Sequence, residues 1–222
     1  NPSVLVSLLE TIYPFNPDEL VRKKGGLSIY DKMRLDDQVR AVLSLKKLAR
    51  LSPGWEIVAG DEEDEESRRA AEFAEWNLET LDGTLEDDLL DIMSALDFGF
   101  SVTEIMWDVV SGGPWDGMVR IKALKTRRPH EFDFKQDPHG NLLEVMQRVA
   151  GREIKVPREK IVHYAYDREF DNPYGRSDLR AVYRNWWSKD VIIRFWNIAI
   201  ERHAQPLIVV PYKQGATATD ID

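Results

Sequence analysis

Near its C-terminal end the chain contains a long run without glycine or proline, SDLRAVYRNWWSKDVIIRFWNIAIERHA (residues 177–204). Ser177 is suited to cap a helix, and Gln205-Pro206 ends the run because the residue before a proline disfavours helical geometry. The run therefore predicts a single helix of about 28 residues. At about 1.5 Å per residue such a helix is about 40 Å long, more than a small domain needs for its own core.

The apolar residues of this run are not confined to one stripe of the predicted helix. Leu179, Trp186 and Ile193 share one face, whereas Trp187 and Val191 point elsewhere. A soluble helix that is apolar on several sides must be covered on several sides. Burial inside a larger monomer and packing against the same helix of neighbouring subunits both satisfy this condition. We favour the second, because the chain is short for wrapping such a rod.

The N-terminal half predicts a set of helices. Residues 1–27, with three prolines and Gly25-Gly26, are typical of an arm and a linker. Helices are predicted at about 31–51, 65–81 and 84–98, and a short strand at 55–59. The first helix carries one apolar stripe: Leu35, Val39, Val42, Leu45 and Leu48. The third opens with a capping box at Thr84 and closes at Gly99.

After Gly99 the apolar period falls to two, which indicates strands. Ile105, Trp107 and Val109 would form the buried face of a hairpin that continues to Ala123. Further strands are predicted at 131–134, 142–149 and 161–166, and another after the long helix at 207–210. The fold class is therefore α+β: helices and an antiparallel β meander followed by one long α-helix. This order disfavours a dinucleotide-binding fold.

The amino-acid composition excludes several classes of site and of function. The 222 residues include no cysteine, which excludes a disulfide scaffold, a thiolate metal site and a cysteine nucleophile. The formal net charge of −9 argues against a protein that coats nucleic acid. That charge is unevenly distributed, because residues 1–119 carry a net charge of about −14 and residues 120–213 about +7. No run of 18 uncharged apolar residues occurs, so we expect no membrane partner.

No catalytic signature is recognisable, and we predict no catalytic, cofactor-binding or metal-binding residue. The four histidines are scattered, and we expect surface or turn positions for them: His130, His139, His163 and His203. The acidic run 61–66 is typical of a solvated loop that leads into a helix N-terminus. Two carboxylate groupings leave a magnesium-dependent nucleic-acid enzyme as an alternative: Asp87-Asp88 with Asp91, and Glu104 with Asp108. A monomeric adaptor whose long helix binds a partner helix is another alternative.

Three stretches, in this order and spacing, resemble a known family. The first is Tyr30-Asp31-Lys32-Met33 with Asp36-Asp37-Gln38-Val39-Arg40 and the segment at Trp55. The second is Leu96-Asp97-Phe98-Gly99-Phe100-Ser101 through Trp107. The third is Asn172-Pro173-Tyr174-Gly175-Arg176-Ser177-Asp178 through Trp186-Trp187 to Pro206. Together they are similar to the portal protein, or head-tail connector, of tailed bacteriophages, and closest to its Mu-type family.

The resemblance implies a homo-oligomeric ring, usually a dodecamer, at the capsid vertex of the virion, assembled in the host cytoplasm. Such a ring passes double-stranded DNA without sequence-specific binding, for packaging, ejection and head-tail joining. Its partners would be the terminase packaging motor, the capsid and head-tail adaptor proteins. By analogy, residues 1–27 are an arm and linker, 28–175 a wing-like domain, 176–205 a stem-like helix, and 206–222 the start of a clip-like segment of a truncated chain.

The resemblance also assigns the long helix to the subunit interface. The interface residues would be Trp186, Trp187, Lys189, Arg194, Phe195 and Trp196. We expect the cations of this helix, among them Lys189 and Arg194, to pair with acidic groups of neighbouring subunits.

Overall fold

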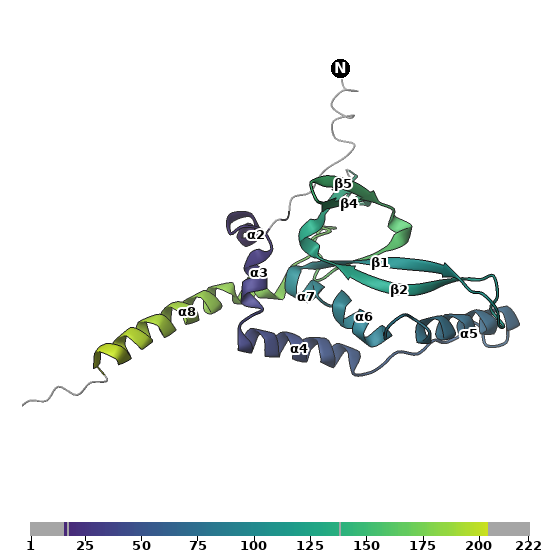
Figure 1. Ribbon diagram of the computed structural model, residues 1–222, viewed down its shortest axis with the longest axis horizontal. Helices are drawn as coiled ribbons and strands as arrows, with labels where there is room; N and C mark the ends of the chain where they lie inside the picture. Colours follow the sequence, from purple (N-terminus) through teal and green to yellow (C-terminus); the bar gives the residue numbers. More distant parts are fainter. Residues whose placement is uncertain (1–15, 17, 138, 204–222) are drawn as a thin grey trace, which may run out of the picture. The chain divides into compact units, whose positions relative to one another are not determined.

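The computed structural model describes residues 16, 18–137 and 139–203 and confirms the α+β class. Helices precede and flank two three-stranded antiparallel sheets, and one long helix follows (Figure 1). The chain divides into two compact units, residues 1–182 and 183–222, so the long helix begins in the first unit and continues in the second.

The first helices differ from those that the sequence predicts. Helix α2 (Glu19–Lys23) falls in the segment expected to be arm and linker. The helix predicted at 31–51 is in fact two, α3 (Ser28–Met33) and α4 (Asp37–Leu51). The break arises because the Asp36 side chain accepts hydrogen bonds from the amides of Gln38 and Val39, both at 3.1 Å, and so caps a new helix.

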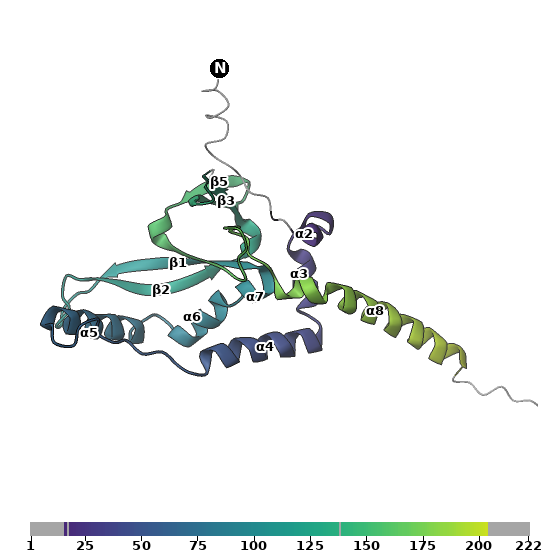
Figure 2. The same ribbon diagram turned by 180° about the vertical axis from the view of Figure 1, so that it is seen from behind.

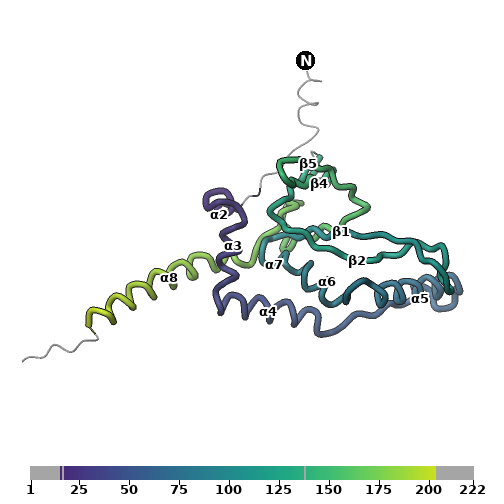
Figure 3. The backbone as a smooth tube through the Cα atoms, in the orientation of Figure 1, coloured from purple at the N-terminus to yellow at the C-terminus, as the bar shows by residue number. Residues whose placement is uncertain are grey.

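The apolar stripe of α4 is largely exposed. Leu43 is its buried residue, and α4 contacts α6 (Leu85–Ile92). Val42, Leu45 and Leu48 are exposed, Leu45 by 69%. Helical periodicity places Leu45 and Leu48 on the side of α4 away from Leu43, with Val42 at the edge of that side. Helix α4 is therefore apolar on two sides, and the described residues cover only one of them. Figure 3 shows α4 running past α6.

The third predicted helix is also divided, into α6 and α7 (Ala95–Phe98), while α5 (Glu65–Glu79) agrees with its prediction. The Thr84 hydroxyl accepts a hydrogen bond from the Asp87 amide at 3.2 Å, which confirms the cap of α6. The Ser101 hydroxyl donates to the carbonyl of Ile92 at 2.7 Å and satisfies the end of that helix. The strand predicted at 55–59 is wrong: these residues connect α4 and α5 without pairing to a sheet.

The strands form two sheets and not a single meander. One sheet has the order β2-β1-β6 and the other β3-β4-β5, and every pair is antiparallel. The chain therefore returns from β5, which the sequence did not predict, to pair β6 with β1. The bounds are β1 (Phe100–Val109), β2 (Val119–Arg127), β3 (Phe132–Gln136), β4 (Leu142–Val149), β5 (Arg152–Val156) and β6 (Ile161–Ala165).

In the half of the β1–β2 hairpin that lies next to its turn, only one of the two faces is covered. In both views α5 and α6 lie on one side of the hairpin and the β3-β4-β5 sheet on the other (Figures 1 and 2). The Asn77 side chain of α5 bonds both the carbonyl and the amide of Ile121, at 2.7 and 3.0 Å. The register shifts between Met106 and Trp107. Trp107 and Val109 are exposed there, which corrects their expected burial.

The core lies where the two sheets meet the start of the long helix. Phe100 of β1, Phe134 of β3 and Tyr174 pack edge to face, with ring centroids 4.9–5.5 Å apart. Burial raises the pKa of Tyr174 to about 12. Leu179, in the first turn of the long helix, is buried as well. The entry into this helix is therefore part of the core.

The long helix α8 spans Asp178–His203, in agreement with the predicted run. Its predicted last residue, Ala204, lies outside the described residues, as do the strand predicted at 207–210 and the clip-like segment. Among the described helices, α8 included, none combines the length and the apolar character that a bilayer-spanning segment requires.

Candidate functional site at the root of the long helix

Two glycines bring the second and third stretches of the family resemblance into backbone contact. The carbonyl of Gly99 accepts a hydrogen bond from the Tyr166 amide, and the carbonyl of Tyr166 accepts one from the Arg176 amide, both at 2.8 Å. A Cβ added at Gly99 would lie 2.5 Å from the Tyr174 carbonyl oxygen, and one added at Gly175 would overlap the carbonyl oxygens of Gly99 and Tyr166. Both glycines also have positive φ angles. The close approach therefore requires glycine twice.

Ser177 links this contact to α8. Its hydroxyl donates to the carbonyl of Asp97 at 2.6 Å and accepts from the amide of Leu179 at 3.0 Å. The second bond confirms Ser177 as the helix cap. The first ties that cap to α7, so the first turn of α8 is fixed to the core by a buried side chain.

Asp97 is a buried charge held by two cations. Its side chain is 1% exposed, and its Oδ2 lies 2.9 Å from both Arg34 Nε and Lys47 Nζ. Its Oδ1 has no hydrogen-bond partner among the described residues. Because a buried carboxylate is costly unless paired, the two ion pairs offset its desolvation. They join α7 to the segment after α3 and to α4.

A second layer of ion pairs surrounds the first turn of α8. Lys46 of α4 pairs with Asp178, whose carboxylate also accepts from the Tyr166 hydroxyl at 3.3 Å. The hydrogen bond to Asp178 raises the pKa of Lys46. Asp18 pairs with Arg180 at 3.1 Å and accepts a hydrogen bond from the Tyr30 hydroxyl.

Burial raises the pKa of Asp18, against the effect of its backbone hydrogen bonds and of Arg180. Tyr30 belongs to the first stretch of the family resemblance, so all three stretches meet at the root of α8.

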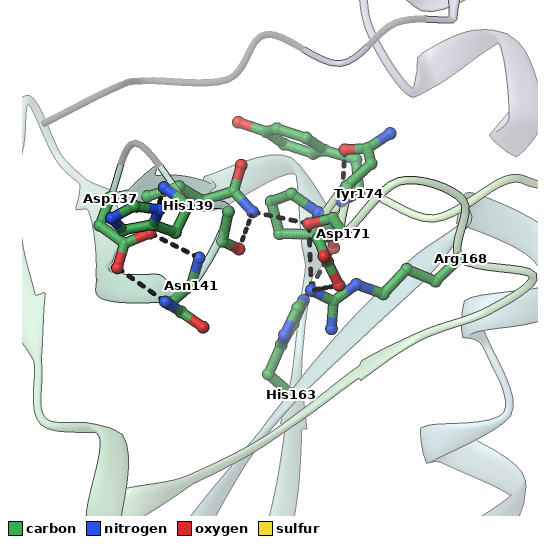
Figure 4. Close-up of polar contacts among 11 residues, drawn as sticks. Asp137, His139, Asn141, His163, Arg168, Asp171 and Tyr174 are labelled. Carbon is green, nitrogen blue, oxygen red and sulfur yellow. Dashed lines mark hydrogen bonds and ion pairs between the residues drawn. The ribbon is translucent and has the colours of Figure 1, made fainter. Parts of the chain in front are cut away.

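The segment that precedes α8 is held to the β3–β4 turn (Figure 4). The Gln136 side-chain amide donates to the carbonyls of Asp171 and Gly140, at 2.6 and 2.7 Å. Arg168 pairs with Asp171 at 2.9 Å. The turn itself is closed by Asp137, whose carboxylate accepts from the Asn141 backbone and side chain, and these bonds lower its pKa. Residues 166–177 are thus fixed at both ends.

His163 occupies this region and is not the surface or turn residue that the sequence predicts. It lies on β6 with its ring 4.6 Å from that of Phe134. Its Nε2 donates to the carbonyl of Pro173 at 2.8 Å, because a carbonyl oxygen can only accept. Burial lowers the pKa of His163 to about 4, so the imidazole is neutral at physiological pH.

We predict that His163 makes the fold acid-sensitive. Its folded pKa lies below the usual value of 6.5, so between about pH 4 and 6.5 the unfolded chain binds more protons than the folded chain. The contribution of the neutral His163 to the free energy of unfolding is complete above pH 6.5, and about 3 kcal/mol of it is lost as the pH drops to 4. His163→Gln removes the titrating group but keeps a donor. Urea unfolding should therefore show a steeper loss from pH 7 to 4.5 in the parent than in this variant; equal losses would contradict the assignment.

The residues predicted for a subunit interface all lie on α8 within the second unit. Trp187, Phe195 and Trp196 are exposed by 54%, 68% and 65%, and Trp186 is half-buried with its ring 6.1 Å from that of Tyr183. Arg194 pairs with Asp190 of the same helix at 2.8 Å. Lys189 is half-buried and engaged in contacts of its own. The pairing of these cations with neighbouring subunits stays a prediction.

Three of the five carboxylates that suggested a magnesium-dependent enzyme have structural partners. Asp87 accepts from the Thr84 hydroxyl at 2.7 Å, whereas Glu104 pairs with Arg127 and Asp108 with Arg120. Burial raises the pKa of Asp88, with smaller contributions from Asp91 and Asp87. Within the described ranges, no group of three or more acidic or histidine side chains is placed to hold a metal ion.

Comparison with known families identifies the chain. A family model described as the portal protein of Mu bacteriophage matches residues 27–222, which is most of the sequence. No curated protein matches the chain. The match includes all three stretches that meet at the root of α8, together with the whole of α8 itself. The chain therefore belongs to the Mu-type family of bacteriophage portal proteins.

Proposed function

We propose that this portal protein is a subunit of a ring-shaped DNA channel at the capsid vertex, which serves genome packaging, ejection and head-tail joining. Its family is structural and not enzymatic, associates with the capsid at a vertex of the virion, and oligomerises. The ring would contain twelve copies. Its partners would be the terminase motor during packaging in the host cytoplasm and adaptor proteins afterwards.

The uncovered apolar surface of α8 is the observation that carries the proposal. Large apolar side chains are exposed all along the helix: Val182, Trp187, Ile192, Ile193, Phe195, Trp196, Ile198 and Ile200. These residues fall on several sides of the helix, so one partner helix cannot cover them all. A ring does so, because each copy then has two different neighbours. The uncovered face of α4 adds to the surface that neighbours would bury.

We extend the proposal to the parts of the chain. Residues 28–175 would form the wing, 176–205 the first stem helix and 206–222 the start of the clip, with residues 1–27 as an arm and linker. The cluster around Asp97 and Ser177 would then be the joint between wing and stem. A joint fixed by buried ion pairs suits a stem helix that must hold one direction in every copy.

The acidic surface suits a channel for DNA. The six acids at 61–66 lead into α5, and the carboxylate of Asp64 caps that helix by accepting from the Ser67 amide at 3.0 Å. Tight phosphate binding would hinder a duplex that has to slide, and an excess of carboxylates opposes such binding. The proposal therefore includes DNA as cargo that passes without sequence-specific contacts.

Truncation of the exposed aromatics of α8 tests the proposal. We expect the double variant Phe195→Ser, Trp196→Ser to raise the protein concentration needed for half-maximal assembly at least tenfold, because large aromatic side chains dominate interface energies. Mass photometry across a dilution series measures this. Val58→Ala, at another exposed apolar position outside α8, is the matched control and should assemble like the parent. Identical dilution curves for the double variant and the parent would refute the role of α8.

A further inference from the structure

The loop between β6 and α8, residues 166–172, presents an aromatic side chain to solvent. Phe170 is fully exposed. Asp167, Phe170 and Asp171 all have φ between 47° and 57°, in the left-handed region that non-glycine residues seldom adopt. Strained backbone at several positions of one loop persists only where surrounding contacts enforce it, and such strain is typical of functional segments.

Ion pairs and hydrogen bonds enforce the shape of this loop. Arg176 pairs with Asp167 and, at 2.9 Å, with Glu169. Arg168 pairs with Asp171, and the carbonyl of Asp171 accepts from Gln136 at 2.6 Å. These contacts hold the residues before and after Phe170 but do not cover its ring. The loop therefore holds one exposed benzyl group in a fixed position, and such preorganisation lowers the entropic cost of binding.

The same chain carries a cavity of the size that a benzyl group needs. A cavity of about 180 Å³ lies between the two sheets. An engineered apolar cavity of about 150 Å³ is known to hold benzene, so this one has room for a phenylalanine ring. Its apolar lining comes from both sheets: Val102, Phe132, Ile154, Val156, Pro157 and Ile161.

The charges around the loop and the cavity are complementary. Asp167, Glu169 and Asp171 flank Phe170 and outnumber by one the two arginines that pair with them, Arg168 and Arg176. Three cations line the cavity, Arg127, Lys155 and Lys160, and two of them are already paired, Arg127 with Glu104 and Lys155 with Glu144. The loop therefore keeps one negative charge in excess around its aromatic side chain, and the rim of the apolar cavity keeps one positive charge in excess. Complementary charges of this kind fix register and partner choice.

We propose that Phe170 of one copy inserts into the inter-sheet cavity of the next copy. The loop and the cavity are unlike surfaces, and contacts between unlike surfaces generate rings when the rotation closes. This inference rests on the proposed ring and adds one contact that joins neighbouring wings. The excess of acids around Phe170 opposes contact with DNA, so a second copy of this chain is the occupant that the charges select.

Disulfide crosslinking tests the contact, because the chain contains no cysteine of its own. We expect the double variant Phe170→Cys, Ile154→Cys to give a ladder of covalent multimers on mild oxidation. Each single variant should stay uncrosslinked, and a mixture of the two should give covalent dimers only. Val58→Cys with Ile154→Cys is the matched control, since Val58 is exposed but lies on neither surface. It should give no ladder.

The outcomes separate this contact from the ring itself. Assemblies of parental mass that give no ladder, or as strong a ladder with the control pair, overturn the contact and leave the proposed function standing. Crosslinked dimers from Phe170→Cys alone also overturn it, because they show that two loops meet. A chain that stays monomeric at every concentration overturns the contact and the proposed function together.

Phe170→Gly supplies an independent readout in the intact protein. Glycine adopts the left-handed backbone freely, so this variant should raise the midpoint of thermal unfolding of the unassembled chain. The same variant should raise the concentration for half-maximal assembly about tenfold, as Phe170→Ala should. A loop with only a structural role predicts that stability and assembly change together, and that result would overturn the proposal.

Discussion

Replacing Gly175 with alanine should destabilise the fold by more than about 3 kcal/mol. The backbone there is left-handed, which costs an L-residue about 1–2 kcal/mol. The new Cβ would also overlap the carbonyl oxygens of Gly99 and Tyr166. The Gly99 oxygen accepts the hydrogen bond from Tyr166 that holds residues 166–177 beside the start of β1, and the Tyr166 oxygen accepts the bond from Arg176 that closes this segment on itself. Relief of the overlap therefore breaks those bonds. Urea unfolding at pH 7, monitored by tryptophan fluorescence, measures the loss.

Gly54→Ala is the matched control for Gly175→Ala. Gly54 also has a positive φ, but a Cβ added there meets nothing within 4 Å. We expect a loss of only about 1 kcal/mol, the cost of the backbone conformation alone. Equal losses for the two variants would show that the approach of Gly99 and Gly175 is not what fixes the root of α8.

Removal of the buried carboxylate is the other substitution with a large expected effect. Asp97→Ala leaves Lys47 and Arg34 facing a site built for an anion, and removal of one partner from a buried ion pair typically costs about 3–5 kcal/mol. Asp97→Asn keeps the shape and loses only the charge, so it should fall between parent and alanine variant. Midpoints and slopes of urea unfolding give the three stabilities.

The control for Asp97→Ala is a substitution in a solvent-exposed ion pair. Glu19 and Lys23 form an exposed i,i+4 pair at 3.2 Å in α2. Such pairs contribute about 0.3–0.5 kcal/mol, so Glu19→Ala should leave stability almost unchanged. If Asp97→Ala cost no more than Glu19→Ala, the cluster at the root of α8 would not be a structural joint.

The sequence predicts elements well where one local signal dominates. The uninterrupted run to His203, the helix cap at Thr84 and the closing Gly99 all have the structural roles expected of them, although the Asp87 carboxylate accepts from the Thr84 hydroxyl and not from a backbone amide. It fails where a side chain restarts a helix, as Asp36 does, or where strands distant in sequence pair, as β1 and β6 do. Neither the capping contact nor the pairing leaves a periodic signal in the sequence.

Apolar periodicity also misled where the covering surface is not part of the described chain. The stripe of α4 and the hairpin residues Trp107 and Val109 have the pattern of buried faces, yet they are exposed in a single copy. Apolar periodicity indicates that a face of an element is buried in the mature assembly, but it does not identify the surface that buries it. For α8, whose apolar residues lie on several sides, the same argument supports the proposal that neighbouring copies of the chain cover it.

The joint at the root of α8 was visible in the sequence only as motifs. Gly99, Gly175 and Ser177 stand in stretches that resemble the family, and their spacing gives no hint that they meet. Asp97 was missed as a buried charge, because a single acidic residue in a predicted helix is usually solvated. Its place between apolar Leu96 and Phe98, in a segment that is apolar throughout, was the available signal.

Electron microscopy of the assembled protein tests the central claim most directly, namely that neighbouring copies cover α8 in a ring. We predict closed ring-shaped particles with a central channel, and a reconstruction in which α8 of each copy packs between those of its two neighbours. Monomers at every concentration, or two-fold dimers in which α8 remains exposed, would contradict the account.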